Sequence, residues 1–223
     1  MVSLRESEQY NGWRVVSVPS RARLMAVAVS LPELWRTRAR LGSVEGFDLE
    51  PANRLLGAVG AEESQGGLGN LPVLPYPIWQ CGGAYKELSQ RATLQEFDFS
   101  SPMLSGDGEV TLECPAAPDS SMGPAGEVPH HAVVHAVVLW MDYGLYDDAN
   151  LTARGEYCHQ FDDKLGGCWL SDQPDGTGLP KPSHQGVMLL QRPVAVVKAA
   201  KNLRIKACFS AHDGNIEFSV LEV

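Results

Sequence analysis

The second half of this 223-residue chain is a series of strand-length segments, and this series restricts the fold more than any other feature. Residues 109–113 alternate polar and apolar side chains and follow a Gly-containing turn at 105–108. A strong hairpin signal, Asp213-Gly214, joins the last two segments. The other segments with strand character are 93–99, 130–145, 186–197, 203–211 and 215–223. Strands in series separated by turns predict a mainly β fold, an antiparallel barrel or sandwich.

The first half of the chain predicts one strand and two short helices. An apolar run of strand character ends at Ser30, and Ser30 and Glu33 have the spacing of a capping box for a helix that stops at Gly42. A second helix is predicted over residues 49–56, with Asp48 as its cap. The helical content of this half is therefore small.

Residues 57–83 have a different character from the segments on either side. They are rich in Gly and Pro, which forbid long regular elements, yet they are too apolar for a solvated linker. An irregular arm that packs against a partner fits this composition. We expect its large apolar residues to bind that partner, with the ring of Trp79 most suited to interface burial. The expected partner-binding residues are Leu71, Tyr76, Ile78 and Trp79.

Composition argues against two classes of partner. Asp and Glu outnumber Lys and Arg by 27 to 18, and the net charge is −9. Such a chain lacks the clustered cations that neutralise phosphates, so we expect no nucleic-acid partner. The longest apolar run, residues 132–141, is interrupted by His135 and is far shorter than the ~20 residues of a membrane helix. We therefore expect no membrane partner.

Cysteine usage indicates the compartment. The five cysteines form no C-x-x-C pair, and the polar residues 1–8 do not resemble a secretory signal. An odd number of cysteines in a chain of this length favours reduced thiols. We expect a cytoplasmic and/or nuclear location.

A metal site is the alternative use of the cysteines and histidines. His131 and His135 share one strand face, and Cys158, His159 and Cys168 follow in the sequence. Structural zinc sites take four ligands, usually as closely spaced pairs, and the spacing here is irregular. The pattern favours hydrogen-bonded histidines and buried thiols, so we predict no metal.

Five segments, in order along the chain, resemble motifs of one enzyme family. They are Val18–Leu24, Val44–Asp48, Gln95–Pro102, His135–Asp142 and Ser183–Leu190. They resemble the barrel half of the protein arginine N-methyltransferases and cover most of residues 15–223. Residues 34–35, 44–48 and 77–81 resemble the branch that carries two methyltransferase modules in one chain, the seventh-member type. Because the sequence ends at a barrel strand, we expect it to correspond to the second, C-terminal module.

The resemblance implies an architecture for the chain. It implies a flexible N-terminus over residues 1–14 and an antiparallel β-barrel or sandwich over 15–223. A short helical, Pro/Gly-rich arm of the dimerisation type is expected at about 48–83. In the family the barrel forms one wall of the substrate groove, and a separate nucleotide-type domain holds S-adenosylmethionine. The chain also has the form expected of a truncated gene model.

The sequence departs from the family at its cofactor and guanidinium sites. A methyl-donor site needs a strand, a Gly-rich turn and a helix, and Gly66–Gly69 has neither the strand before it nor the helix after it. Glu62 and Glu63 are adjacent, so their side chains do not converge on one guanidinium. We therefore expect no cofactor-binding residues in this chain and assign S-adenosylmethionine to the complete enzyme.

The substrate loop of the family is only partly retained. His184 is present, but the tryptophan beside it in the family is replaced by Gln185. Without that indole the arginine pocket loses an aromatic wall and a cation–π partner. His184 is the remaining candidate for a catalytic role, by analogy, and a structural hydrogen bond is the alternative.

Two functions are compatible with these observations. In the first, the chain is the substrate-groove and module-docking part of an S-adenosylmethionine-dependent arginine methyltransferase, inactive alone. Its partners are a cofactor-domain module, in the same chain or a dimer partner, and Arg-rich protein substrates. In the second, it is a non-catalytic β-sandwich protein-interaction module.

Overall fold

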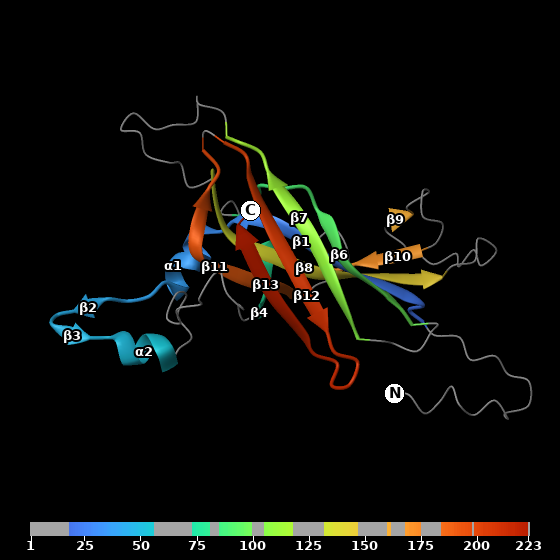
Figure 1. Cartoon of the computed structure of the whole chain (residues 1–223), viewed down its shortest axis with the longest axis horizontal. Coiled ribbons are helices and arrows are strands. Elements are labelled where there is room, and N and C mark those ends of the chain that lie inside the picture. Colours follow the sequence, from blue (N-terminus) through green and yellow to red (C-terminus); the bar gives the residue numbers. More distant parts are fainter. Residues whose placement is uncertain are drawn as a thin grey trace, which may run out of the picture.

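The computed structural model shows a two-layered β structure from which one segment projects (Figure 1). The described residues are 18–55, 73–80, 85–99, 105–117, 132–146, 160–161, 168–174, 184–197 and 199–222.

The larger sheet is built around two long central strands, β1 (Arg21–Ser30) and β8 (Val133–Tyr146). They pair antiparallel from Arg21↔Gly144 to Val29↔Ala136. The order β4-β11-β8-β1-β5 runs across the sheet, while β6 also pairs with β1, β10 with β8, and β9 with β10. The bounds of these strands are β4 Val73–Tyr76, β5 Lys86–Glu87, β6 Ala92–Asp98, β9 Gln160–Phe161, β10 Cys168–Ser171 and β11 Gln185–Ala195.

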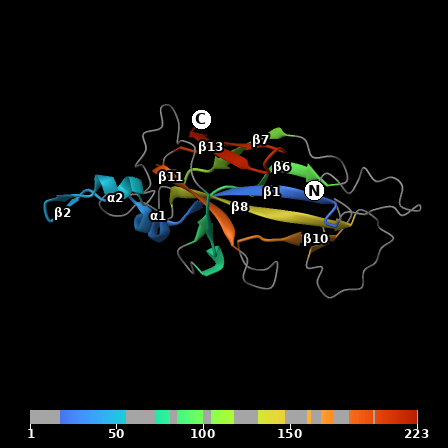
Figure 2. The ribbon, with the colours of Figure 1, turned by 90° about the horizontal axis from the view of Figure 1, so that it is seen from below.

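The smaller sheet has the order β13-β12-β7 and lies over the larger sheet as a second layer (Figure 2). Its strands are β7 (Gly106–Cys114), β12 (Lys201–Phe209) and β13 (Ile216–Glu222), all paired antiparallel. In β12 buried residues alternate with partly exposed ones, as expected for a strand with one face on the core and one in solvent.

The Asp213-Gly214 signal marks the β12–β13 hairpin, as predicted. Gly214 has a φ of +73°, a conformation that glycine adopts at no steric cost. Its amide donates to the Ser210 carbonyl at 2.9 Å, and the Asp213 carboxylate accepts from the Asn215 amide at 3.1 Å. The turn therefore fixes the register of the two strands.

The main hydrophobic core lies between the two sheets. β1 contributes Ala22 and Leu24, and β12 contributes alternate residues such as Ile205, which is 0% exposed. Phe97 and Phe209 meet edge to face across the layers, with ring centroids 5.4 Å apart. Burial of this apolar surface is the dominant favourable contribution to folding.

A second, smaller core lies on the opposite face of the larger sheet. It takes Val27 and Val29 from β1, while Ala26 and Ala28 of the same strand point into the main core. These four residues are all 0% exposed. The second half of β1 is thus buried on both faces, as strands covered by two layers are.

Helix α1 (Pro32–Arg38) covers this smaller core. The indole N–H of Trp35 donates to the Leu190 carbonyl at 2.8 Å and so ties the helix to β11. The predicted capping box is wrong, because Leu31 occupies the N-cap position with no side-chain hydrogen bond. Ser30 is instead the last residue of β1, and its hydroxyl lies 3.4 Å from Nδ1 of His135.

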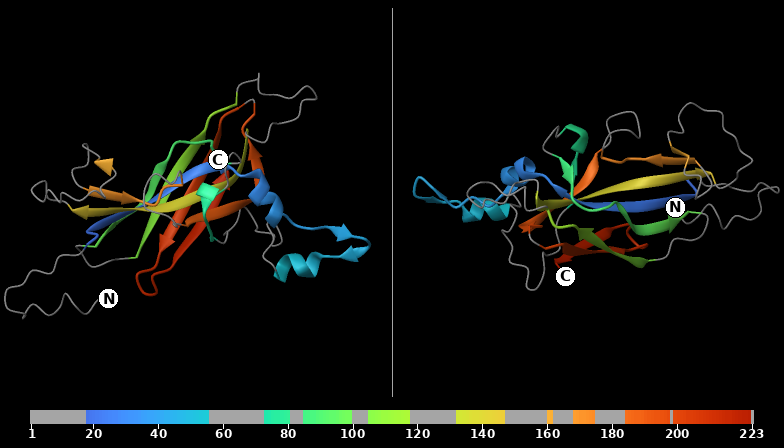
Figure 3. Two further views of the ribbon diagram at one scale, coloured as in Figure 1. Left: turned by 180° about the vertical axis from the view of Figure 1, so that it is seen from behind. Right: turned by 90° about the horizontal axis from the view of Figure 1, so that it is seen from above.

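Residues 39–55, here called the arm, project away from the rest of the described structure, here called the body (Figure 3). Strands β2 (Ser43–Val44) and β3 (Phe47–Asp48) form a tight hairpin. Its two central residues have positive φ, 51° at Glu45 and 85° at Gly46, the signature of a type I′ turn. Helix α2 (Glu50–Leu55) follows, and the carboxylate of Asp48, the predicted cap, accepts from the amide of Glu50, the first helical residue, at 2.9 Å.

The predicted fold class is confirmed: the structure is mainly antiparallel β. Among the described strands no closed barrel is detected, and the two sheets meet as layers with an isolated bridge between Ala117 and Val197. Within the range 48–83 assigned to the arm, β4 and the 3-10 turn η2 (Ile78–Gln80) lie with the body, because β4 pairs with β11. Residues 56–72 lie outside the described ranges.

Candidate functional site

His184 lies at the entrance of β11, where the chain returns to the larger sheet. It is exposed, whereas Gln185, the next residue, is 1% exposed. The Gln185 side chain accepts from the Ile78 amide at 3.1 Å and donates to the Asp172 carbonyl at 2.9 Å. The backbone around His184 is therefore held by a buried amide rather than by an aromatic ring.

Three consecutive residues at the end of β10 are anchored to the body, two of them to β8 and one to Arg91. The Ser171 hydroxyl donates to the Asp142 carboxylate on β8. The Asp172 amide donates to the Met141 carbonyl at 3.1 Å. The Gln173 side chain accepts from Arg91 at 2.8 Å. The end of β10 is thus fixed in place before the chain continues toward His184.

Two carboxyl groups in this region have raised pKa values. Burial raises the pKa of Asp142, although hydrogen bonds from Ser171 and Trp140 act in the opposite direction. Burial also raises the pKa of Asp172, and repulsion from Asp142 adds to it. One carboxylate oxygen of Asp172 is buried without a hydrogen-bond partner among the described residues. This part of the body therefore concentrates negative charge that its surroundings only partly compensate.

Two arginines stack on tryptophans beside these acids. The guanidinium of Arg23 lies 4.3 Å from the Trp169 ring centroid, and that of Arg91 lies 5.6 Å from the Trp140 ring centroid. Both distances are within the range of cation–π attraction. Arg91 also forms an ion pair with Glu87 at 2.8 Å. The aromatic faces are thus covered by the chain's own cations.

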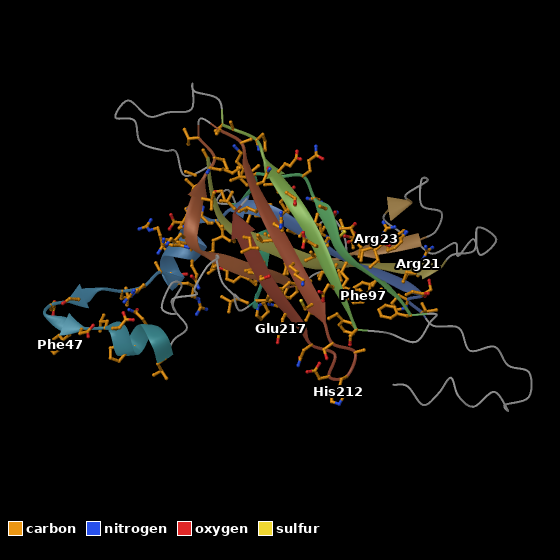
Figure 4. All side chains as sticks on the ribbon, in the orientation of Figure 1. Arg21, Arg23, Phe47, Phe97, His212 and Glu217 are labelled. Carbon is orange, nitrogen blue, oxygen red and sulfur yellow. The ribbon has the colours of Figure 1, made fainter. Side chains whose placement is uncertain are left out.

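The arm carries large apolar side chains on its surface. Phe47 is 72% exposed and Leu55 is 86% exposed, and Leu41 and Val44 are about half exposed. Figure 4 shows Phe47 at the outer end of the arm, at the opposite end of the molecule from Arg21 and Arg23. Exposed apolar side chains gathered on one projecting element are typical of an interaction surface.

The arm is braced by a few polar contacts. Asn53, which is 2% exposed, donates to the Leu41 carbonyl at 2.6 Å and accepts from the Leu41 amide at 2.9 Å. Arg40 and Glu50 form an ion pair at 2.6 Å. These contacts hold α2 against the incoming chain and leave the apolar side chains outside.

The four predicted partner-binding residues lie in different environments. Leu71 lies outside the described residues, and for Trp79 only the backbone is described. Tyr76 is half-buried in β4. Ile78 is 1% exposed and packs in the smaller core, so its side chain is used inside the fold.

The metal alternative is addressed only by the described side chains. Among them there is no group of three or more His, Cys, Asp or Glu residues placed to hold a metal ion. His135 is buried and packs near the ring of Trp35, with centroids 6.3 Å apart. His131, Cys158 and His159 lie outside the described ranges.

Of the cysteines, Cys114 and Cys208 are described as free thiols. Burial raises the pKa of Cys114 to about 11, so this thiol remains protonated and unreactive at neutral pH. In the described part of the chain, no helix has the length and apolar character needed to cross a membrane.

Sequence reasoning missed the two features that give the site its form. The Val44–Asp48 motif contains two apolar residues of the arm, but the sequence does not indicate that their side chains are exposed. The side-chain bonds of Gln185 join residues far apart in sequence, and no local pattern signals them. Only the replacement of the family's tryptophan by Gln185 pointed to that position.

Comparison with known proteins gives the chain its relatives. It is 31% identical over 204 residues to protein arginine N-methyltransferase 7 of Oryza sativa subsp. japonica, a match that covers 91% of this chain and 23% of that protein. It is 36% identical over 182 residues to protein arginine N-methyltransferase 1.6 of Arabidopsis thaliana, covering 81% of this chain and 20% of that protein. No protein-family model matches the chain.

A solved structure supports the fold. The Trypanosoma brucei PRMT1 enzyme–prozyme heterotetrameric complex with AdoHcy aligns with a TM-score of 0.52 at 14% identity, covering 92% of this chain and 56% of that one. At this identity the likeness bears on fold alone.

The layered antiparallel body and the projecting apolar arm define a mainly antiparallel β domain. By its similarity to the two plant proteins, this domain is related to the protein arginine N-methyltransferase family. The chain spans about a quarter or less of the length of the curated relatives it matches.

Proposed function

We propose that this chain is the substrate-groove and module-docking part of an S-adenosylmethionine-dependent protein arginine methyltransferase. The observation that carries the proposal is the arm, whose residues Phe47 and Leu55 are 72% and 86% exposed. A chain related to arginine methyltransferases over most of its length gains from such a surface only if another module covers it. The partner proposed is a methyltransferase cofactor-domain module.

The described residues do not fit S-adenosylmethionine. All the named strand pairs are antiparallel, whereas the Gly-rich turn of a methyl-donor site follows a strand of a parallel sheet. The Gly66–Gly69 segment lies outside the described ranges. We propose that the cofactor is held by the partner module and that this chain alone does not turn over.

The proposed contribution to the substrate groove comes from the region around His184. His184 is exposed at the start of β11, and the partly buried Asp172 is bonded through its carbonyl to the next residue, Gln185. A chain with a net charge of −9 attracts Arg-rich protein substrates through long-range electrostatics that salt screens.

A binding experiment tests the docking role. The chain is titrated by calorimetry against an isolated cofactor-domain module of a protein arginine methyltransferase. We expect binding that the double substitution Phe47→Ser with Leu55→Ser weakens by about thirtyfold or more, as the loss of central interface anchors does. The matched control is Leu221→Ser, a 38% exposed leucine on the β13 strand of the body. Equal affinity of the arm variant and the control would exclude docking through the arm.

An activity experiment tests the catalytic assignment. Methylation of an Arg-rich peptide is measured with the chain alone, the module alone and both together. We expect turnover to rise when the chain is added to the module and to be absent with the chain alone. Tight binding of S-adenosylmethionine by the chain alone contradicts the proposal. Binding of an unrelated protein, with no response to the module, favours the non-catalytic interaction module instead.

The proposal includes a cytoplasmic or nuclear location, consistent with the free thiols of Cys114 and Cys208. A fluorescent fusion of the chain, imaged in cells, tests it. Fluorescence in a secretory compartment would contradict it.

A further inference from the structure

Gln185 is a buried amide whose two ends are both engaged. It is 1% exposed, and its oxygen accepts from the Ile78 amide at 3.1 Å while its nitrogen donates to the Asp172 carbonyl at 2.9 Å. Its backbone also pairs with Tyr76 in the β4–β11 ladder. Its side chain therefore joins three segments: the turn η2, the residue that follows β10 and the start of β11.

The bond to Asp172 has a special place in the chain. Asp172 and Gln185 stand immediately before and after residues 173–184, the stretch that ends in His184. The bond therefore ties the two ends of this stretch together. Because Gln185 directly follows His184, this bond fixes the position at which the chain enters β11.

The Asp172 side of this bond is itself held firmly. The Asp172 amide donates to the Met141 carbonyl at 3.1 Å. Its neighbours Ser171 and Gln173 bond to Asp142 and Arg91, respectively. The Asp172 carbonyl that accepts from Gln185 is therefore held in place by the body.

The chemistry of the contact requires an amide. Only a side chain with an acceptor and a donor on one rigid group serves both the Ile78 N–H and the Asp172 carbonyl. Replacement by an apolar side chain leaves both partners buried without hydrogen bonds, which costs more than the bonds themselves contribute. A carboxylate keeps the acceptor and loses the donor.

We propose that Gln185 is a positioning residue: its two side-chain bonds, to Ile78 and Asp172, here called the latch, fix the start of β11 and so set the position of His184. This inference rests on the proposed function for its catalytic meaning. Where the family has a tryptophan beside this histidine, the present chain has the two hydrogen bonds of the buried Gln185 amide.

Amide exchange and His184 ring spectra of the full chain test the latch by NMR. In Gln185→Met, we expect the Ile78 amide to exchange about tenfold or more faster, as the loss of a buried hydrogen bond predicts, and the carbonyl carbon resonance of Asp172 to shift. We also expect the His184 ring resonances to broaden or shift. The matched control is Gln95→Met, which removes an exposed bond to the Gly106 carbonyl of 3.3 Å elsewhere in the body.

A second variant separates the two halves of the latch. Gln185→Glu retains an acceptor for the Ile78 amide but has no donor for the Asp172 carbonyl at neutral pH. We expect protection of the Ile78 amide to persist, while the carbonyl carbon resonance of Asp172 and the ring resonances of His184 shift. If Gln185→Met does not fold, this variant tests the latch alone. Unchanged Asp172 carbonyl and His184 ring resonances in a folded Gln185→Glu chain would overturn the proposal.

Kinetics with a cofactor-domain module separate positioning from folding. We expect Gln185→Glu to raise KM for an Arg-rich peptide about tenfold and to leave KM for S-adenosylmethionine unchanged. Unchanged peptide kinetics in a variant whose His184 has moved would overturn the positioning role. If the wild-type chain supports no methylation at all, the proposed function fails, and the NMR result still decides whether Gln185 is the latch.

Discussion

The body buries its large apolar side chains, whereas the arm leaves its own exposed to solvent. In the body, residues such as Ile205 and Val27 are 0% exposed, and each sheet covers the other. In the arm, Phe47 is 72% exposed, and the one fully buried polar side chain described there is Asn53 at 2%. The body is therefore stabilised by burial within the chain, and the arm by a turn, a cap and a few hydrogen bonds.

The two regions also differ in how far apart in sequence their contacting residues lie. Contacts in the body couple strands that are far apart in sequence, so a local change there affects the whole structure. Contacts in the arm join residues close in sequence, such as Asn53 with Leu41, so a change there stays local. The exposed apolar residues of the arm, such as Phe47 and Leu55, belong to neither core of the body.

The largest expected effect is a cavity in the main core. Ile205→Ala removes a side chain that is 0% exposed and should lower the free energy of unfolding by about 3 kcal/mol. Leu55→Ala, at an arm position that is 86% exposed, should change it by less than about 0.5 kcal/mol. Urea unfolding measures both. Equal losses would mean that the arm folds cooperatively with the body.

Replacing one glycine in the body and one in the arm by alanine compares how tightly the two regions pack. A Cβ at Gly108 would overlap the Leu94 carbonyl oxygen and lie 2.8 Å from the Gln95 Cβ, so Gly108→Ala should cost about 2 kcal/mol by forcing β7 away from β6. A Cβ at Gly42 meets nothing within 4 Å, and Gly42→Ala should be close to neutral. Thermal unfolding of both variants checks this. A neutral Gly108→Ala would show that the β6–β7 contact is loose.

Asn53→Ala tests whether the arm opens independently. It removes both bonds to Leu41, so the amide of Leu41 should exchange about tenfold faster. The melting temperature of the body should not change. Hydrogen exchange followed by NMR reports the first, and calorimetry reports the second. A lowered melting temperature would contradict the separation of arm and body.

The smallest effect is electrostatic and depends on pH. The pKa of Asp172 is raised by burial and by Asp142, so its ionised form destabilises the folded body, and stability falls as pH rises through that raised pKa. Asp172→Asn should therefore melt higher at pH 7, by less than about 4 °C once solvent screening is allowed for. The gain should vanish below the ordinary aspartate pKa of about 3.9. Asp48→Asn in the arm is the control, and a gain that persists at pH 3 would contradict this origin.

Much of the body could be predicted from sequence because its signals are local. The alternation in residues 109–113 predicted β7, and Asp213-Gly214 predicted the β12–β13 hairpin. Asp48 correctly marked the start of α2. Each of these depends on one turn or one strand face, which the order of residues specifies directly.

The remaining features depend on neighbours that the sequence does not specify locally. The Ser30–Glu33 spacing fits a capping box, but pairing of β1 with β8 extends the strand through Ser30 and leaves Leu31 at the N-cap. Ile78 lies in a Pro-rich segment, and pairing of β4 with β11 places that segment against the body. In each instance tertiary pairing decided the outcome over the local pattern.

The position of β1 has a consequence for synthesis of the protein. β1 is an early element of the chain, yet the hydroxyl of Ser20, just before it, bonds to the carbonyl of Gly144, 124 positions later. At roughly 5–20 residues per second, a ribosome needs on the order of ten seconds to reach β8, the strand that pairs with β1. During that time an apolar strand with no completed sheet is exposed, so nascent chains should require chaperone protection until β8 emerges.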